Sequence, residues 1–183
     1  MKSRLVKRKV VHQGRFLRFV ELGTWEAVER TSPRPAVGIA ALTEEGGMIL
    51  VEQHRPPMGG SVIEVPAGLC GDLPGNSREP LVAAARRELM EETGYRARSL
   101  RHILTGPVSP GITDEQVALF VATGCRRAGE GGGDSTESIV VHVIPLQRVR
   151  AWLARRLKGG GIVDVKVHLA LLILERVALL RHR

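Results

Sequence analysis

The sequence predicts a mixed α/β fold built around one main domain. The chain has 183 residues, 43% of them hydrophobic, which suits a single domain with its own core. Short apolar segments bounded by Pro and Gly fill most of its first half and are typical of strands. One helical segment and further strands follow, and two helical segments close the chain.

The expected strands are short and end at turn residues. Residues 4–12 and 15–30 are expected to be two extended stretches joined at Gln13-Gly14. A turn at residues 44–47 separates the next two strands, and Pro66 stops the one after them. These later strands are expected at residues 36–42, 48–52, 62–65, 100–104, 117–122 and 138–144.

Three helices are expected, each bounded by helix-ending residues. The first runs from about Glu79 to Thr93, with Pro80 in its first turn and Gly94 as its C-terminal cap. The other two cover about residues 146–157 and 162–180, with three glycines between them. A Pro-containing linker divides the chain into an N-terminal strand extension, residues 1–34, and a main domain, residues 35–183.

Charge and composition limit the classes of partner. The net charge is +8, which raises the chance of an anionic partner, but the arginines are spread along the chain rather than clustered. Aromatic residues make up only 3% of the chain, too few for a platform that stacks single-stranded nucleic acid. We therefore expect no nucleic-acid partner, and a nucleic-acid-binding module remains the less favoured alternative.

No segment reads as a membrane or export signal. The most apolar stretch, residues 162–180, is interrupted by five charged or His residues. Five of the first nine residues are charged, where a secretory signal is apolar. Two cysteines, Cys70 and Cys125, form neither a disulfide framework nor a zinc site. We expect a cytoplasmic protein without membrane partners.

Three carboxylates share one face of the central helix. At about 100° per residue, Glu88 and Glu92 lie about 40° apart, and Glu91 lies on the neighbouring edge. Like charges at this spacing repel, so the helix needs Arg86, Arg87 or a divalent cation nearby. Carboxylate oxygens suit Mg²⁺ or Mn²⁺. On charge alone, a metal site and a solvated acidic face both remain open.

The spacing along this helix resembles the box of the Nudix hydrolases. That box runs Glu, seven residues, Arg-Glu, an apolar residue, any residue, Glu-Glu, any residue, Gly and an apolar residue. The chain matches it from Glu79 through Arg87-Glu88-Leu89 and Glu91-Glu92 to Gly94-Tyr95. Segments outside the box are similar to those of the ADP-ribose pyrophosphatase and nucleoside diphosphate sugar hydrolase subgroup, namely residues 51–55, 64–68, 109–115 and 137–139.

One element departs from the box. Its glycine should stand six residues before Glu79, where this chain has Leu73. The natural match is Gly68, eleven residues before Glu79. We interpret the five extra residues as a lengthening of the surface loop at residues 71–77, a kind of segment that tolerates insertion.

The resemblance implies a fold and an activity. The fold is a Nudix-type α/β/α sandwich with a mixed central sheet, plus N-terminal antiparallel strands. The activity is metal-dependent hydrolysis of the pyrophosphate linkage of ADP-ribose or a related nucleoside diphosphate sugar, which gives a nucleoside monophosphate and a sugar phosphate. Mg²⁺ is the implied cofactor, with Mn²⁺ possible, and the implied assembly is a homodimer whose N-terminal strands help form the nucleoside pocket.

The resemblance also assigns roles to individual residues. The implied metal ligands are Glu88, Glu91, Glu92, Glu137 and the backbone carbonyl of Ala67. Glu79, Arg87 and Gly94 shape the box, and the implied substrate contacts are Arg55, Gly111, Asp114 and Glu115.

The catalytic base stays open at this point. Glu137 and Glu91 are the expected catalytic residues, because Ser135 stands where the subgroup has a base and cannot serve as one. Asp134 and Glu130 are the alternatives. A Nudix-fold ligand sensor without turnover is the competing function, favoured by Ser135 and disfavoured by the intact box.

Overall fold

The computed structural model describes residues 6–32, 34–72, 75–133 and 138–181. Its described strands form a large mixed sheet with the order β11-β6-β5-β4-β9-β8, and β10 and β7 pair additionally with β5 and β4. β4 runs parallel to β9 and β11 parallel to β6, while the other pairs are antiparallel. The strands are β4 (Ala36–Thr43), β5 (Gly47–Arg55), β6 (Gly60–Glu64), β7 (Ala67–Leu69), β8 (Tyr95–Pro107), β9 (Gln116–Arg127), β10 (Ile139–Pro145) and β11 (Ile162–Val163).

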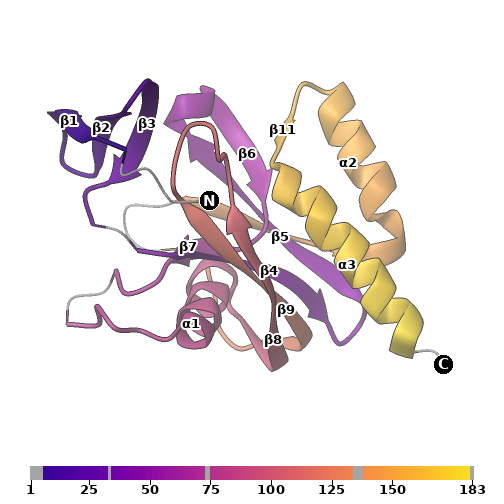
Figure 1. Cartoon of the computed structure of the whole chain (residues 1–183). Coiled ribbons are helices and arrows are strands. Elements are labelled where there is room, and N and C mark those ends of the chain that lie inside the picture. Colours follow the sequence, from indigo (N-terminus) through magenta and orange to yellow (C-terminus); the bar gives the residue numbers. More distant parts are fainter. Residues whose placement is uncertain (1–5, 33, 73–74, 134–137, 182–183) are drawn as a thin grey trace.

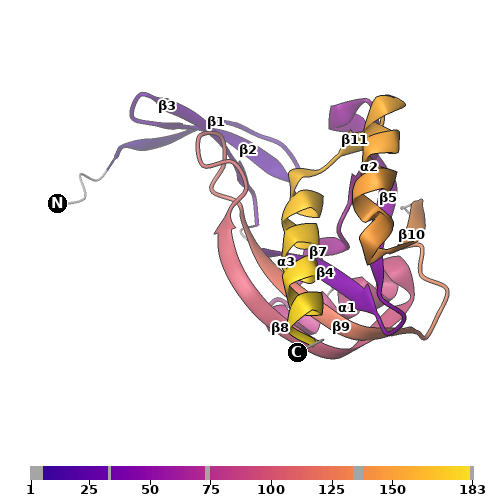
Figure 2. The same cartoon turned by 90° about the vertical axis from the view of Figure 1, so that its right-hand side faces the viewer.

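Helices cover both faces of this sheet. α1 (Leu81–Thr93) lies on one face, and α2 (Val149–Lys158) and α3 (Val165–Arg181) lie on the other (Figures 1 and 2). β4 serves both layers because successive side chains on a strand point to opposite faces. Its Val37, Ile39 and Ala41 join the core under α1, whereas Ala40 and Leu42 join the core under α2 and α3. The predicted α/β/α sandwich with a mixed central sheet is confirmed.

The N-terminal extension is a separate antiparallel sheet of three strands, β1 (Arg8–Gln13), β2 (Leu17–Leu22) and β3 (Trp25–Arg30). Residues 15–30 therefore form a hairpin and not the single extended stretch expected from the sequence. The chain reverses at Gly23, whose φ of 64° is open to glycine at no steric cost. The division at residue 34 remains a prediction.

This N-terminal sheet meets the main domain at the loop after β8. The amide of Val28 donates to the carbonyl oxygen of Ile112 at 2.8 Å. Arg30 forms an ion pair with Glu115, at 2.5 Å between Nη2 and Oε1. β3 is thereby tied to the loop that precedes β9 (Figure 1).

Several elements differ in length from those expected. β8 extends over residues 95–107 because its pairing with β9 continues along the whole hairpin, from Tyr95 opposite Arg127 to Pro107 opposite Gln116. The segment at 162–180 begins with β11, and α3 starts only after Asp164. A 3₁₀ turn at Leu146–Arg148 precedes α2, and α1 begins at Leu81 rather than at Glu79. Across the described residues, none of the helices has the length and apolarity needed to cross a membrane.

Candidate active site

Helix α1 presents its charged side chains to a cleft because its other face is buried. Ala84, Ala85 and Leu89 pack in the core against the sheet, which leaves the acidic face on the side of the cleft. The helix ends at Gly94, whose φ is 75° and whose amide donates to the carbonyl oxygen of Met90. A Cβ at Gly94 would lie 2.4 Å from the carbonyl oxygen of Gly129, so the close approach of that segment requires glycine.

Arg87 holds four acidic side chains on this wall. Its Nε and Nη2 donate to the two carboxylate oxygens of Glu79, each at 3.0 Å. Its Nη1 donates to Glu88 at 2.9 Å and to Glu91 at 2.8 Å. Nη2 also reaches Asp72 in the lengthened loop, at 2.9 Å. The guanidinium fork therefore fixes the relative positions of these carboxylates.

Glu79 is the most deeply buried partner of Arg87, with 4% of its side chain exposed. Its Oε2 also accepts the amide of Gly71 at 2.9 Å, which anchors the start of the loop to the helix. The hydrogen bonds from Arg87 hold the pKa of Glu79 below its ordinary value despite the burial. This ion pair is consistent with a shaping role for Glu79 and Arg87, which remains a prediction.

Gly68 leaves the space that the carboxylate of Glu88 occupies. A Cβ at residue 68 would lie 2.1 Å from Cδ of Glu88, far inside the 3.0 Å below which Cβ contacts are essentially never found. This contact supports the interpretation of Gly68 as the box glycine, with the insertion confined to the loop after it. Burial raises the pKa of Glu88 to about 7, against the opposing charge of Arg87. Glu88 is thus a carboxylate whose negative charge is poorly compensated.

Glu92 and Ala67 lie side by side. The amide of Ala67 donates to Oε2 of Glu92 at 3.0 Å. Ala67 belongs to β7, which is fixed by pairing with β4 opposite Gly38. The backbone of β7 therefore lies directly against the acidic face of α1.

The donor set of this wall fits a hard divalent cation. It offers carboxylate oxygens and backbone oxygens, with a buried Glu88 that lacks full compensation. Nevertheless, no three His, Cys, Asp or Glu side chains in the described stretches converge on one metal position as they stand. Glu88 and Glu91 are both bonded to Arg87 instead. Metal ligation by these carboxylates requires them to turn away from that guanidinium.

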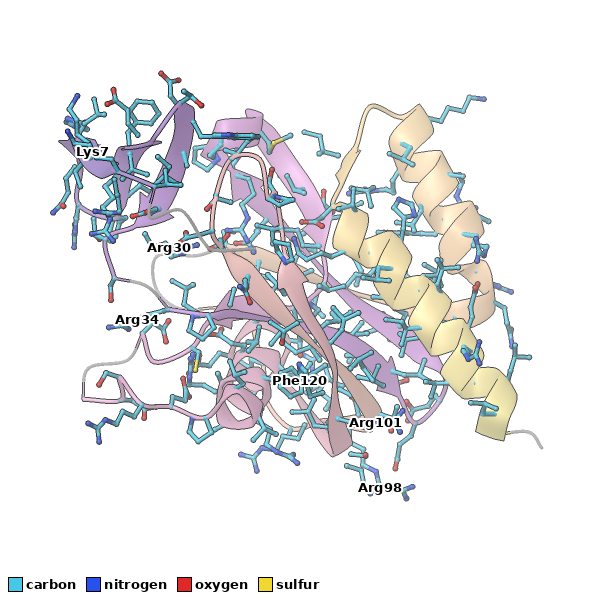
Figure 3. All side chains as sticks on the ribbon, in the orientation of Figure 1. Lys7, Arg30, Arg34, Arg98, Arg101 and Phe120 are labelled. Atoms are coloured by element: carbon cyan, nitrogen blue, oxygen red, sulfur yellow. The ribbon has the colours of Figure 1, made fainter. Side chains whose placement is uncertain are left out.

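The acidic wall faces a cleft of about 710 Å³. Its other side carries cations that are each paired with an acid. Arg55 bonds Glu64 at 2.8 Å, and Arg30 bonds Glu115. The cleft is also lined by Lys166, from the first turn of α3. Figure 3 shows Arg30 at the junction of the N-terminal sheet and the main domain.

Not all the expected site residues line this cleft. Arg55, Ala67, Glu88, Glu91, Glu92 and Glu115 line it together with Arg87. Gly111 and Asp114 border a separate hollow of about 390 Å³ beside Trp25 on the N-terminal sheet. Glu79 lies just before α1 and pairs with Arg87, and Gly94 caps the C-terminal end of the helix. Glu137, Ser135 and Asp134 lie outside the described residues.

The glycine-rich segment after β9 docks on the end of α1. The amides of Gly132 and Gly133 donate to the carbonyl oxygens of Glu92 and Glu91, at 2.9 and 3.0 Å. These contacts satisfy carbonyls that a helix end otherwise leaves without partners. They also bring Gly133 to the edge of the cleft.

Four charged residues that line the cleft were not identified from the sequence. They are Arg30, Glu64, Asp72 and Lys166. Glu64 belongs to one of the segments that resemble the subgroup, and Lys166 is one of the charges that interrupt the apolar C-terminal stretch, so the sequence marks both. Arg30 and Asp72 had none, because a hairpin and a lengthened loop bring them to the cleft.

The chain is similar to several known proteins. The model of the NUDIX domain family matches residues 32–159. A methanol dehydrogenase activator from Bacillus methanolicus is 29% identical over 188 residues, covering 99% of this chain and 97% of that protein. An ADP-ribose pyrophosphatase from Bacillus subtilis is 42% identical over 87 residues, covering 48% of this chain and 44% of that protein. A crystal structure of an ADP compounds hydrolase shares the fold, with a TM-score of 0.68, 20% identity and coverage of 96% of this chain and 93% of that one.

Proposed function

This chain belongs to the Nudix family and is a pyrophosphohydrolase, and we propose that it hydrolyses ADP-ribose or a related nucleoside diphosphate sugar. The products are a nucleoside monophosphate and a sugar phosphate, and the reaction depends on a divalent metal, Mg²⁺ or Mn²⁺. The observation that carries this proposal is the acidic wall of α1, where Glu88, Glu91 and Glu92 border one cleft below β7.

Glu88, Glu91 and Glu92 are the side chains that would hold the metal, together with the backbone carbonyl of Ala67. A bound divalent ion neutralises phosphate oxygens and lowers the pKa of water, the chemistry that pyrophosphate hydrolysis requires. The role of Arg87 is to hold the carboxylates near one another while no cation is present. Glu79, fixed by Gly71 and Arg87, keeps that guanidinium in place.

The opposite wall of the cleft suits the rest of the substrate. Arg55 is 41% exposed and its guanidinium bonds Glu64 with one nitrogen at 2.8 Å. A planar guanidinium can bind phosphate oxygens with two donors, so we assign Arg55 to the diphosphate. Glu115, paired with Arg30, is positioned to accept hydrogen bonds from the hydroxyl groups of the sugar.

We assign the catalytic base to Glu91 or Glu137. Glu91 is 46% exposed, the most accessible of the three carboxylates on α1, so it can reach water in the cleft. Glu137 follows Gly133 by four residues, a separation that extended chain spans with at most about 14 Å. Because Gly133 lines the cleft, this reach supports the assignment of Glu137 as a base or a fourth acidic ligand.

The experiment that tests the proposal is hydrolysis of a substrate panel. ADP-ribose, ADP-glucose, GDP-mannose, NADH and a diadenosine polyphosphate are incubated with Mg²⁺, with Mn²⁺ and with EDTA, and phosphate-coupled product formation is followed. We expect turnover that needs the metal and that falls by about 10²–10³-fold in Glu92→Gln. Glu45→Gln, which changes an exposed turn residue, serves as the matched control. Turnover of no panel member, with metal still bound, favours a ligand sensor instead.

We also propose that two copies pair through the N-terminal sheet and that the protein works in the cytoplasm. Val10, Val11, Leu17 and Trp25 on this sheet are between 40% and 64% exposed. Exposed apolar groups on one small sheet are typical of an interface. A dimer mass for the wild type and a monomer mass for Trp25→Glu in light scattering would support pairing, and monomers for both would contradict it.

A further inference from the structure

The lengthened loop adds one acid to the wall of α1. Asp72 belongs to residues 71–77, the segment in which this chain departs from the box. It lines the cleft, and its carboxylate accepts a hydrogen bond from Nη2 of Arg87 at 2.9 Å. The other acids bonded to this arginine belong to the box itself. Asp72 is therefore a partner of Arg87 that the spacing of the box does not account for.

The backbone on the N-terminal side of Asp72 is held from two directions. The amide of Gly71 donates to Oε2 of Glu79 at 2.9 Å, which ties the loop to the start of α1. The carbonyl oxygen of Gly71 accepts a hydrogen bond from Nη1 of Arg34, in the linker after the N-terminal sheet. Figure 3 shows Arg34 beside this part of the chain. Asp72 follows Gly71 directly, so these bonds keep its carboxylate within reach of Arg87.

The two terminal nitrogens of Arg87 serve different acids. Nη1 has two hydrogens, which it donates to Glu88 and Glu91. Nη2 also has two hydrogens but has three acceptors in reach. These acceptors are carboxylate oxygens of Asp72 and Glu79, at 2.9 and 3.0 Å, and the carbonyl oxygen of Leu69 at 3.1 Å. The Nη2 side therefore keeps more acceptors than it needs, whatever happens on the Nη1 side.

This arrangement changes the cost of moving the acids on Nη1. Metal ligation requires Glu88 and Glu91 to leave that nitrogen, and their attraction to the guanidinium opposes the move. A second acid on the Nη2 side offsets part of the positive charge of Arg87 and adds negative charge beside the two departing carboxylates. Both effects weaken the hold of Arg87 on Glu88 and Glu91, so both favour a bound cation.

We propose that Asp72 is a positioning residue that releases Glu88 and Glu91 from Arg87 for metal ligation. The inference rests on the proposed function and adds to it a role for the lengthened loop. Asp72 acts through Arg87 and is not itself a ligand. The affinity of the cleft for a divalent ion therefore depends on a negative charge at residue 72, even though 42% of the Asp72 side chain is exposed.

The test measures binding of Mn²⁺ alone, so it does not depend on turnover. The signal of free Mn²⁺ in electron paramagnetic resonance gives the affinity of the wild type and of each variant. Asp72→Asn removes the charge at constant size, and Asp72→Glu keeps the charge on a longer arm. Glu45→Gln, at an exposed turn residue, is the matched control for loss of one carboxylate. Thermal unfolding of each variant confirms that it is folded.

We expect Asp72→Asn to bind Mn²⁺ about fivefold more weakly than the wild type, an effect of the size that one partly exposed charge pair produces. The affinities of Asp72→Glu and Glu45→Gln should stay within twofold of the wild type. A loss below threefold in Asp72→Asn would overturn the inference. An equal loss in Asp72→Glu would also overturn it, because the charge would then not be what matters.

A second background separates action through Arg87 from a general effect of charge. Arg87→Lys keeps a positive charge beside the buried Glu79 but replaces the planar fork with a single nitrogen. In this background Asp72→Asn should change the Mn²⁺ affinity by less than threefold. A loss of threefold or more there would overturn the inference, since Asp72 would then act only as a negative charge near the ion.

Hydrolysis of the substrate panel by the wild type is scored independently. If no panel member is hydrolysed but the Mn²⁺ affinities respond as expected, the proposed function fails and the role of Asp72 stands. If hydrolysis needs the metal but Asp72→Asn binds Mn²⁺ as the wild type does, the inference fails and the proposed function stands. A wild type that binds no Mn²⁺ would overturn the inference outright.

Discussion

The two walls of the cleft differ in how their charges are balanced. On the α1 wall, Asp72, Glu79, Glu88 and Glu91 all bond one arginine, Arg87. On the opposite wall, Arg30, Arg55 and Lys166 each have an acid of their own. The first wall carries surplus negative charge, and burial makes that charge costly at Glu88. The second wall is nearly neutral and needs no added ion.

The difference separates two tasks within one cleft. A surplus of buried carboxylates is unfavourable in the folded protein unless a cation joins it, which suits a metal site. Paired charges offer both donors and acceptors without a net field, which suits recognition of an uncharged sugar beside a phosphate. The structure therefore predicts that changes on the α1 wall affect stability and the chemical step, and that changes on the opposite wall affect binding.

Removal of Arg87 should have the largest effect on stability. Arg87→Met leaves Glu79 buried beside Glu88 without a counter-ion, so we expect the free energy of unfolding to fall by about 3 kcal/mol. Urea denaturation followed by circular dichroism gives the value. Arg87→Met combined with Glu79→Leu should recover part of the loss. A loss below 1 kcal/mol in the single variant would mean that the acids on this wall do not depend on Arg87.

A side chain at residue 68 should lower kcat, because Gly68 packs against Glu88. In Gly68→Ala the new Cβ cannot remain 2.1 Å from Cδ of Glu88, so the carboxylate or β7 must move. Displacements of about 1 Å in a catalytic site cost roughly 10²-fold in rate. We expect a loss of that size in kcat with a folded protein. Gly14→Ala, where a Cβ would make only an ordinary contact at 3.5 Å, is the control. Equal rates for both variants would argue against this contact.

Glu79 should make stability depend on pH. Arg87 lowers the pKa of Glu79 in the folded state, so the folded protein gives up this proton at a lower pH than the unfolded chain. The resulting stability is present above the ordinary carboxyl pKa and is lost as pH falls through the folded value. Glu79→Gln should lower the free energy of unfolding by about 1–2 kcal/mol at pH 7. The difference between the variant and the wild type should become smaller at acidic pH. Urea titrations at pH 7 and pH 3.5 measure this difference in unfolding free energy. A difference that grows on acidification would contradict the lowered pKa of Glu79.

Arg55 on the opposite wall should affect binding with little effect on stability. Arg55 pairs with Glu64, and 41% of the Arg55 side chain is exposed. Exposed ion pairs contribute about 0–1 kcal/mol to the free energy of unfolding. For Arg55→Met we expect a change in unfolding free energy within about 0.5 kcal/mol. We also expect KM for the best panel substrate to rise by roughly tenfold, the loss of one charged hydrogen bond. An unchanged KM would remove Arg55 from the substrate site.

The sequence was most informative where spacing along one element decides geometry. The carboxylate face of α1 follows from helical periodicity, and its cap follows from the glycine at residue 94, so both could be predicted residue by residue. Elements whose ends depend on long-range pairing were less accessible. The hairpin at Gly23 and the full length of β8 are set by partner strands, and the break at Asp164 depends on the pairing of β11 with β6.

The opposite wall was the least predictable part of the site. It gathers Arg30, Glu64 and Lys166 from β3, β6 and α3, which are far apart in the chain. No local pattern encodes that meeting. Gly111 and Asp114 show the converse, because a motif placed them near the substrate while the structure puts them at a neighbouring hollow beside the N-terminal sheet. Their role in substrate binding stays a prediction.

The most direct measurement is the position of a bound metal. Crystals of the wild type grown with Mn²⁺ and an anomalous difference map locate the ion without reference to activity. We expect a peak within coordination distance of carboxylate oxygens of Glu88 and Glu92, with Glu91 turned away from Arg87, and no such peak in Glu92→Gln. A peak elsewhere, or full occupancy in Glu92→Gln, would contradict the assignment of the α1 wall as the catalytic metal site.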